Sequence, residues 1–142
     1  MRDSFDIKKM LLIRAKIADF YNSCINQAAK RCGISKAEAD VLLFFYNNPD
    51  FFLESDAVKF RGFDENFLRN SVDLLVSNGL VTVSEDSTNR KIVINGKGGI
   101  IAKSINGAQK RAISGLFKDF SADDFAHFER ILSVIVKNAG GL

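Results

Sequence analysis

The stretch that decides the fold covers residues 56–91 and reads DAVKFRGFDENFLRNSVDLLVSNGLVTVSEDSTNRK. It begins with a short helical segment, for which Glu54 or Ser55 is the expected cap. Gly62 interrupts this segment, because glycine adopts left-handed backbone conformations at little cost. Asp64 is then a typical N-cap, since its carboxylate accepts a hydrogen bond from a free backbone N–H in the first helical turn. The sequence therefore predicts two helices joined by a tight turn.

The second of these helices has one apolar face and a defined end. Leu68, Val72 and Leu75 recur at spacings of four and three residues, which predicts that they face the core. The dipeptide Asn78-Gly79 is a strong stop signal, because both residues tolerate positive φ.

Two runs of β-branched residues follow, at residues 80–84 and 91–94, and both have the composition of strands. The polar segment 85–90 between them is expected to form a hairpin tip. Helix, turn, helix and two-stranded wing together make a winged helix-turn-helix. In such modules the second helix usually enters the DNA major groove.

Helical patterns precede this stretch. Apolar residues recur at three and four residues from Asp3 or Ser4 to about Arg31, and the apolar face is wide enough to suggest burial on two sides. One side would face the chain's own core and the other a partner. Residues 35–38 (SKAE) fit a capping box for the next helix, which Pro49 should end.

Helical patterns also follow the wing. Asn95 is expected to cap a helix from about Lys97 to Phe120, and Ser121 a last helix with an apolar face. We therefore expect a mainly α fold with a small β-wing, a winged helix-turn-helix flanked by long N- and C-terminal dimerisation helices. The connection at residues 50–53 is expected to bury two aromatic side chains.

Length and composition favour one cytoplasmic domain. A chain of 142 residues with a single proline and no Ser/Gly-rich linker suits one core. The sequence has no apolar run long enough for a membrane span and no apolar signal core near its start. Cys24 and Cys32 lie on one predicted helix, about 12 Å apart at a rise of ~1.5 Å per residue, which is too far for a disulfide.

Charge is unevenly distributed along the chain. The net charge is +3, yet residues 54–94 carry five basic and seven acidic side chains, which gives −2. Phosphate contacts supply most of the non-specific affinity for DNA. The winged stretch is therefore not a strong generic DNA-binding surface.

The order of elements resembles that of the multiple-antibiotic-resistance regulator (MarR) family. Residues 56–63 (DAVKFRGF) look like the family's helix and turn before the recognition helix, and residues 71–81 (SVDLLVSNGLV) are similar to its recognition-helix end and first wing strand. Residues 95–98 (NGKG) stand where the family usually has a Thr-x-x-Gly helix start. The resemblance implies one MarR-like domain over residues 1–142, with residues 1–33 and 96–138 as the dimerisation part and residues 34–95 as the winged part.

Two motifs depart from the family pattern. Residues 65–69 (ENFLR) replace the usual Lys-Ser-x-Val-Ser run and place an acid at the start of the recognition helix, where it favours the helix dipole. Residues 89–91 (NRK) stand in place of the Asp-x-Arg motif of the wing. The resemblance therefore implies only that the wing is basic, through Arg90 and Lys91.

The exposed face of the second helix, the turn and the wing supply the candidate DNA contacts. Asn70 suits adenine, Arg69 guanine or a phosphate, and Phe67 a thymine methyl. Arg61 suits a phosphate, and Arg90 the minor groove or the backbone. The expected DNA-binding residues are Arg61, Asn66, Phe67, Arg69, Asn70, Arg90 and Lys91. A solvated helix face, with Phe67 as a core or partner contact, is the alternative.

The terminal helices carry more apolar surface than one winged domain can bury, which predicts a homodimer. The expected interface residues are Ile13, Ile17, Phe125, Phe128, Leu132 and Ile135. A two-fold dimer places two recognition helices roughly 34 Å apart on double-stranded DNA, so the expected function is transcriptional regulation at a palindromic operator. The alternative is a winged-helix dimer with weakened DNA binding that acts through protein contacts.

Other functional classes have little support in the sequence. His127 stands alone, so no metal site is expected, and no nucleophile–base pair, phosphate loop or nucleotide fingerprint indicates an enzyme or a cofactor. Cys24 and Cys32 are interpreted as inert or as redox sensors. The resemblance implies a small aromatic ligand as a candidate effector, in a pocket lined by phenylalanines such as Phe20, Phe44, Phe45, Phe51 and Phe52.

Overall fold

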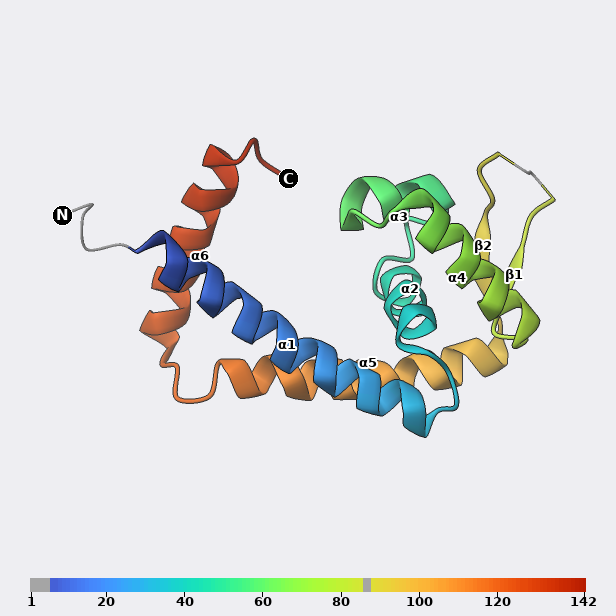
Figure 1. The fold of residues 1–142 in the computed structure, drawn as a ribbon, viewed down its shortest axis with the longest axis horizontal. Coiled ribbons are helices and arrows are strands. Elements are labelled where there is room, and N and C mark those ends of the chain that lie inside the picture. The colour runs from blue at the N-terminus through green and yellow to red at the C-terminus, as the bar shows by residue number, and fades with distance from the viewer. Residues whose placement is uncertain (1–5, 86–87) are drawn as a thin grey trace. The chain divides into compact units, whose positions relative to one another are not determined.

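The computed structural model describes residues 6–85 and 88–142. Within these ranges the chain is mainly helical with one small antiparallel sheet, as predicted (Figure 1). It divides into two compact units at Ala112 and Ile113, and each is described by itself. The elements, in chain order, are α1 (Ile7–Arg31), α2 (Lys36–Asn47), α3 (Glu54–Arg61), α4 (Glu65–Ser77), β1 (Val81–Val83), β2 (Ile92–Ile94), α5 (Gly96–Leu116) and α6 (Ala122–Asn138).

Most predicted helix ends are confirmed by their caps. At α2, the Ser35 hydroxyl accepts from the Glu38 N–H at 3.2 Å, and the Glu38 carboxylate accepts from the Ser35 N–H at 3.2 Å. At α4, the Asp64 carboxylate accepts from the Phe67 N–H at 3.0 Å. Gly62 ends α3 with a φ of 76°, in the left-handed region that favours glycine.

The predicted start of α3 needs correction, whereas the predicted start of α1 is not tested. The expected start of α1 at Asp3 or Ser4 falls outside the described residues; the described helix follows Asp6, whose carboxylate accepts from the Lys8 N–H at 2.9 Å. The cap of α3 is Leu53 rather than Glu54 or Ser55, because Asp56 supplies the carboxylate that accepts from the Leu53 N–H.

Helix α4 ends at Asn78-Gly79 as predicted, and α5 ends earlier than expected. Asn78 has a φ of −82°, so Gly79, at 72°, alone takes the left-handed conformation after α4. Helix α5 ends at Leu116 and not at Phe120, and the chain turns at Asp119, whose φ is 73°.

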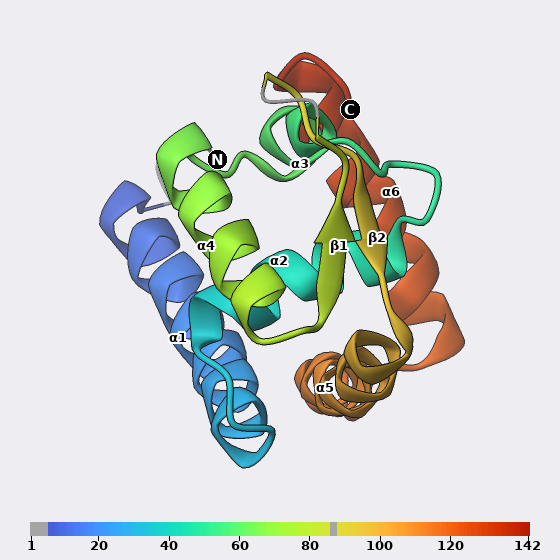
Figure 2. The same ribbon diagram turned by 90° about the vertical axis from the view of Figure 1, so that its right-hand side faces the viewer.

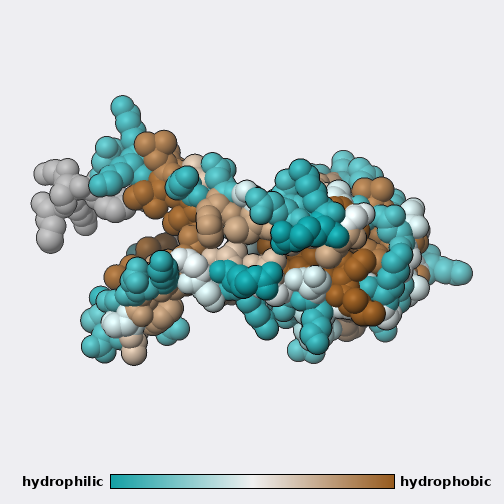
Figure 3. Space-filling view, turned by 90° about the horizontal axis from the view of Figure 1, so that it is seen from below, coloured by the Kyte–Doolittle hydropathy of each residue, from teal (hydrophilic) through white to brown (hydrophobic). Residues whose placement is uncertain are grey.

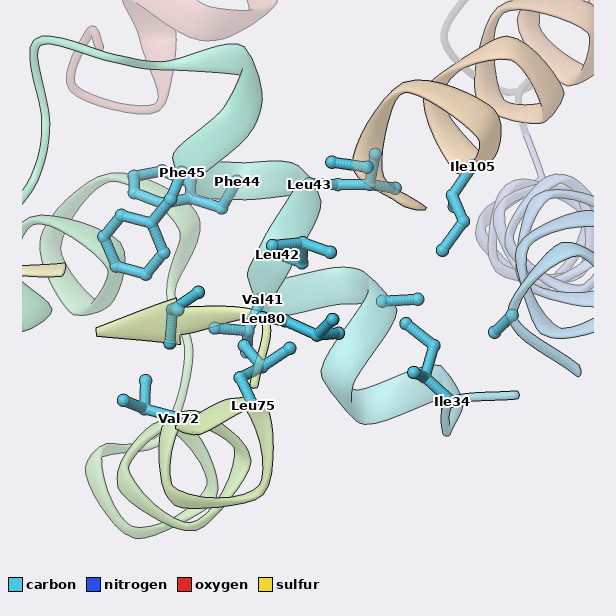
Figure 4. Packing of buried hydrophobic residues seen from close by; sticks show 14 of the residues in the cluster. Ile34, Val41, Leu42, Leu43, Phe44, Phe45, Val72, Leu75, Leu80 and Ile105 are labelled. Carbon is cyan, nitrogen blue, oxygen red and sulfur yellow. The ribbon is translucent and has the colours of Figure 1, made fainter. Parts of the chain in front are cut away.

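The core of the first unit surrounds α2, in which five consecutive residues from Val41 to Phe45 are buried. Leu68, Val72 and Leu75 of α4 are buried with them, as the periodicity predicted. Figure 4 shows Val72 and Leu75 of α4 beside Leu80, all on one side of α2. Ile105 of α5 lies on the other side of α2. Burying one such aliphatic side chain contributes about 1.5–3 kcal/mol, so α4 is fixed chiefly by this face.

The wing is attached to the segment before α3. Strands β1 and β2 pair antiparallel, with Thr82 opposite Val93 (Figure 2). Leu53 forms a further antiparallel bridge with Lys91, and the Ile92 N–H donates to the Phe52 carbonyl at 2.7 Å. The segment at residues 50–53 is therefore tied to the wing by an isolated bridge and a backbone hydrogen bond, and its aromatics are less buried than expected, since Phe52 is 43% exposed.

One further contact fixes the end of α4. The Glu38 carboxylate, which caps α2 with one oxygen, accepts a hydrogen bond from the Asn78 carboxamide at 2.6 Å with the other. Glu38 is 4% exposed, and this sharing leaves neither of its oxygens unpaired.

The start of α5 packs closely against the end of α4. The Asn95 carboxamide oxygen accepts from the Gly98 N–H at 2.9 Å, and its nitrogen donates to the Gly79 carbonyl at 2.6 Å. A Cβ atom at Gly98 would lie 2.0 Å from the Leu80 carbonyl oxygen. The absence of a side chain at this position is therefore a packing requirement.

The second unit is organised by phenylalanines. Phe117, Phe120, Phe125 and Phe128 pack ring against ring, with centroid separations such as 5.1 Å between the first two. Ser121 caps α6 as predicted. Hydrogen bonds to the Asp124 carboxylate from the Ser121 backbone N–H and from the Ser121 hydroxyl hold the pKa of Asp124 below its usual range. Helix α6 has no buried residue.

The N-terminal half of α1 exposes a series of apolar side chains. Ile7 is 68% exposed and Leu12 is 71% exposed. Figure 3 shows hydrophobic side chains gathered on this part of α1. Among the described residues, no helix is long and apolar enough to cross a membrane.

Candidate nucleic-acid interface

The outer surface of helix α4 includes a strip of four neutral residues beside the exposed Asp73. Because Leu68, Val72 and Leu75 face the core, the helix turns Asn66, Phe67, Asn70 and Leu74 outward, and we call these four residues the reading face. Phe67 is 37% exposed and Leu74 is 47% exposed. Neither asparagine carboxamide has a hydrogen-bond partner within residues 6–85 and 88–142. Both therefore have donors and acceptors to offer to a ligand.

The N-terminal end of α4 is acidic and aromatic. Asp64 and Glu65 are exposed at the first turn, where they complement the helix dipole and would repel a phosphate. The Phe63 ring packs on the Phe67 ring at a centroid distance of 5.7 Å, and the exposed Arg61 guanidinium lies 5.0 Å from the Phe63 centroid. Arg61 is thus a cation held beside the turn, as a phosphate contact requires.

Arg90 lies in the most connected polar cluster of the winged half. Its Nε and Nη2 atoms bind the two carboxylate oxygens of Glu54 at 2.7 and 3.0 Å, and its Nη1 donates to Asp73 at 2.7 Å. The side chains of Arg90 and Glu54 are only 11% and 9% exposed. The hydrogen bond to Glu54 raises the pKa of Arg90 further above its ordinary value, burial opposes this, and Asp73 adds to the rise.

This cluster engages two of the three arginines predicted to contact DNA, Arg69 and Arg90. A groove contact by Arg90 would require breaking a bidentate pair with a buried carboxylate, so we assign Arg90 to holding the wing against α3 and α4. Arg69, with a side chain 43% exposed, also reaches Glu54, at 3.6 Å. Two cations of the expected contact set are therefore partly neutralised by one glutamate.

A second connection joins the wing to α3. The Ser55 N–H donates to the Asn89 carboxamide oxygen at 3.0 Å, and the Asn89 nitrogen donates to the Ser55 hydroxyl at 2.9 Å. Sequence reasoning missed the roles of Glu54 and Asn89. No local spacing marks them, because the partners are 34 to 36 residues apart and meet only in the folded chain.

Three of the five phenylalanines proposed to line a ligand pocket meet at one cavity. Phe45, Phe51 and Phe52 line an open cavity of about 450 Å³ against β2, together with Tyr46 and the predicted contact Lys91, whose ammonium lies 5.2 Å from the Phe52 centroid. Phe44 and Phe45 are 7% and 5% exposed and also belong to the core. Phe20 lines a different cavity, of about 200 Å³, with Cys24 and Arg111.

The expected dimer residues are largely at the surface of their own units. On α1, Ile13 is 50% exposed and Ile17 is 48% exposed. In the second unit, Phe128 is half-buried among the phenylalanines, whereas Phe125, Leu132 and Ile135 are exposed.

Cys24 and Cys32 are both free thiols. Within the described part of the chain, no three His, Cys, Asp or Glu side chains are grouped as a metal site would need.

Comparison with known proteins identifies the fold. The sequence matches no protein-family model and no curated protein. The structure is similar to a MarR transcriptional regulator from Methanosarcina mazei Go1, with a TM-score of 0.81, 15% identity and coverage of 95% of this chain and 92% of that one.

Two of the similar structures contain DNA. One is a putative MarR family regulator from Listeria monocytogenes complexed with 26mer DNA (TM-score 0.78, 17% identity, 94% of this chain and 89% of that one). The other is the S. aureus MepR–DNA complex (TM-score 0.76, 13% identity, 94% and 99%). The predicted MarR-like fold is therefore confirmed.

Proposed function

We propose that this chain, which has the fold of the MarR transcriptional regulators, is itself a cytoplasmic DNA-binding regulator without catalytic activity. The observation that carries the proposal is the reading face of α4. It places two carboxamides that have no partner among the described residues on the exposed side of the helix that such modules insert into the major groove. The wing is held beside that helix by Arg90, so both elements are presented as one rigid surface.

The regulator is proposed to act as a homodimer on a palindromic operator. Support comes from the apolar side chains that the described structure leaves at the surface on α1 and, separately, on α6, since exposed apolar patches usually mark an interface. Two-fold symmetry then sets two recognition helices roughly 34 Å apart, one DNA turn.

Light scattering tests the dimer. The expected mass at micromolar concentration is twice the chain mass of 15.7 kDa. Ile13→Glu combined with Ile17→Glu should shift the protein toward the monomer, because buried unpaired carboxylates are costly in an interface. Val93→Glu, at a position 48% exposed on β2 and outside the proposed dimerisation part, is the matched control and should remain dimeric. A wild-type monomer would refute the proposed homodimer.

A salt titration of binding to duplex DNA from the region upstream of the chain's own gene tests DNA binding. Affinity should fall as salt rises, and Arg61→Ala should weaken binding and reduce the slope of log affinity against log salt by about 1, since one phosphate contact is lost. Lys103→Ala, an exposed lysine on α5, should leave the slope unchanged. No detectable binding even at low salt would refute the proposal.

Control by a small aromatic ligand is also proposed. Its support is the cavity of about 450 Å³ with aromatic walls, which has the size and apolar character typical of small-molecule sites. One wall of this cavity is strand β2 of the wing, so binding of a ligand in the cavity would be coupled to the position of the wing.

The alternative function is a winged-helix dimer that acts through protein contacts. It is favoured by the net charge of −2 over residues 54–94 and by exposed aromatic side chains such as Phe60, which is 50% exposed. The salt titration distinguishes the two functions, because a protein-contact module shows no duplex binding at low salt.

A further inference from the structure

We propose that the reading face recognises successive A·T base pairs in the major groove, and that it does so with neutral groups rather than with cations. This inference rests on the proposed DNA binding and adds what kind of half-site the protein selects. It follows from three features of α4: free carboxamides, exposed apolar side chains, and arginines already engaged by carboxylates.

The carboxamides fit adenine. Asn66 and Asn70 are four residues apart on α4, so they lie on the same face one turn from each other. An asparagine side chain donates one hydrogen bond and accepts another, which matches N7 and the N6 amino group of adenine. Because neither carboxamide has a partner in the described part of the protein, neither must give up an internal hydrogen bond to bind a base.

The apolar members of the reading face fit thymine. Phe67 and Leu74 are seven residues apart, two turns of the helix, and Asn70 lies between them on the same side. Apolar side chains contact the C5-methyl group of thymine, which projects into the major groove. A carboxamide flanked by apolar groups therefore matches both bases of an A·T pair.

Guanine recognition has no comparable group. The commonest contact to guanine is a bidentate arginine or lysine. Arg69 is the single basic residue in the sequence of α4, and its guanidinium lies 3.6 Å from the Glu54 carboxylate. Arg90 is bound by Glu54 and Asp73, and the first turn of α4 carries Asp64 and Glu65. These acids also weaken sequence-independent attraction to phosphates.

The test begins with selection of bound duplexes from a pool with 30 random base pairs, using the full-length protein. The expected product has A·T-rich half-sites. Two base analogues then probe the two contacts in the selected duplex. 7-Deazaadenine removes the N7 acceptor, and deoxyuridine in place of thymidine removes the methyl group. Each is expected to weaken binding about tenfold when placed in a half-site, and to have no effect in the flanking sequence.

Single substitutions assign the contacts. In Asn70→Ala the penalty of 7-deazaadenine should disappear at one position, because the partner is gone. In Leu74→Ala the penalty of deoxyuridine should fall in the same way. Both residues are exposed, so the variants should fold, as far-ultraviolet circular dichroism will report. Asn22→Ala, an exposed asparagine on α1, should retain both penalties.

The outcomes separate this inference from the function on which it rests. Enrichment of G·C half-sites, or tight binding that neither analogue weakens, would overturn the neutral A·T readout and leave DNA binding in place. Failure to enrich any sequence at low salt would overturn both. Loss of both penalties in Asn22→Ala would show that the effects do not come from α4, and would also overturn the inference.

Discussion

Gly98→Ala is expected to lower the free energy of unfolding by about 3 kcal/mol or more, at the upper end of what overpacking costs. The added Cβ would lie 2.0 Å from the Leu80 carbonyl oxygen and 2.9 Å from its carbonyl carbon. These are backbone atoms at the junction of α4 and β1, so they cannot rotate away as a side chain would. Relief requires α5 to move off the wing, which breaks the hydrogen bonds of Asn95.

Urea unfolding measures this effect, with Gly99→Ala as the control. The neighbouring glycine lies in the same turn of α5, and a Cβ there would meet no atom within 4 Å. Alanine is favoured over glycine in a helix by roughly 1 kcal/mol, so Gly99→Ala should be neutral or stabilising. Equal stability of the two variants would contradict the close approach at Gly98.

Arg90→Met should cost about 3 kcal/mol, because removing one partner of a buried ion pair leaves the other charge uncompensated. The stranded group is the Glu54 carboxylate, whose side chain is 9% exposed. Methionine retains the length of the side chain, so the loss reports charge and hydrogen bonding rather than a cavity. Arg111→Met, an exposed arginine on α5, should change stability by less than about 0.5 kcal/mol.

A double substitution isolates the pair. Glu54→Gln in the Arg90→Met background should recover most of the stability lost in Arg90→Met, as measured by urea unfolding. The double variant has neither the buried carboxylate nor its cation, so no buried charge is left uncompensated. If the double variant is as unstable as the sum of the two single variants, the two side chains are not coupled, and the role assigned to Arg90 is wrong.

The sequence predicted those parts of the fold that local chemistry decides. The spacing of Leu68, Val72 and Leu75 located the buried face of α4, and Ser35 and Asp64 marked helix starts through caps that reach only three residues. Such signals are contained within one helical turn, so a single sequence carries them.

The parts that local pattern missed depend on contacts across the fold. Arg90 was a candidate DNA contact because the resemblance implies a basic wing; in the folded chain it pairs with Glu54 and Asp73, and its contact with DNA stays a prediction. Residues 50–53 were expected to be a short connection with two buried aromatics, whereas Leu53 forms an isolated bridge with Lys91 and Phe52 is 43% exposed. The exposed face of α4 was predicted by elimination, and the contacts of that face with DNA stay a prediction.

The carboxylate of Glu38 serves two helices at once, and this has a mechanical consequence. With one oxygen on Ser35 and the other on Asn78, it ties the first turn of α2 to the last turn of α4. Neither end can fray alone without leaving a buried charge short of a partner. The two turns therefore open and close as one unit, so that the rigidity of α4 is set partly by residues that are forty positions earlier in the chain.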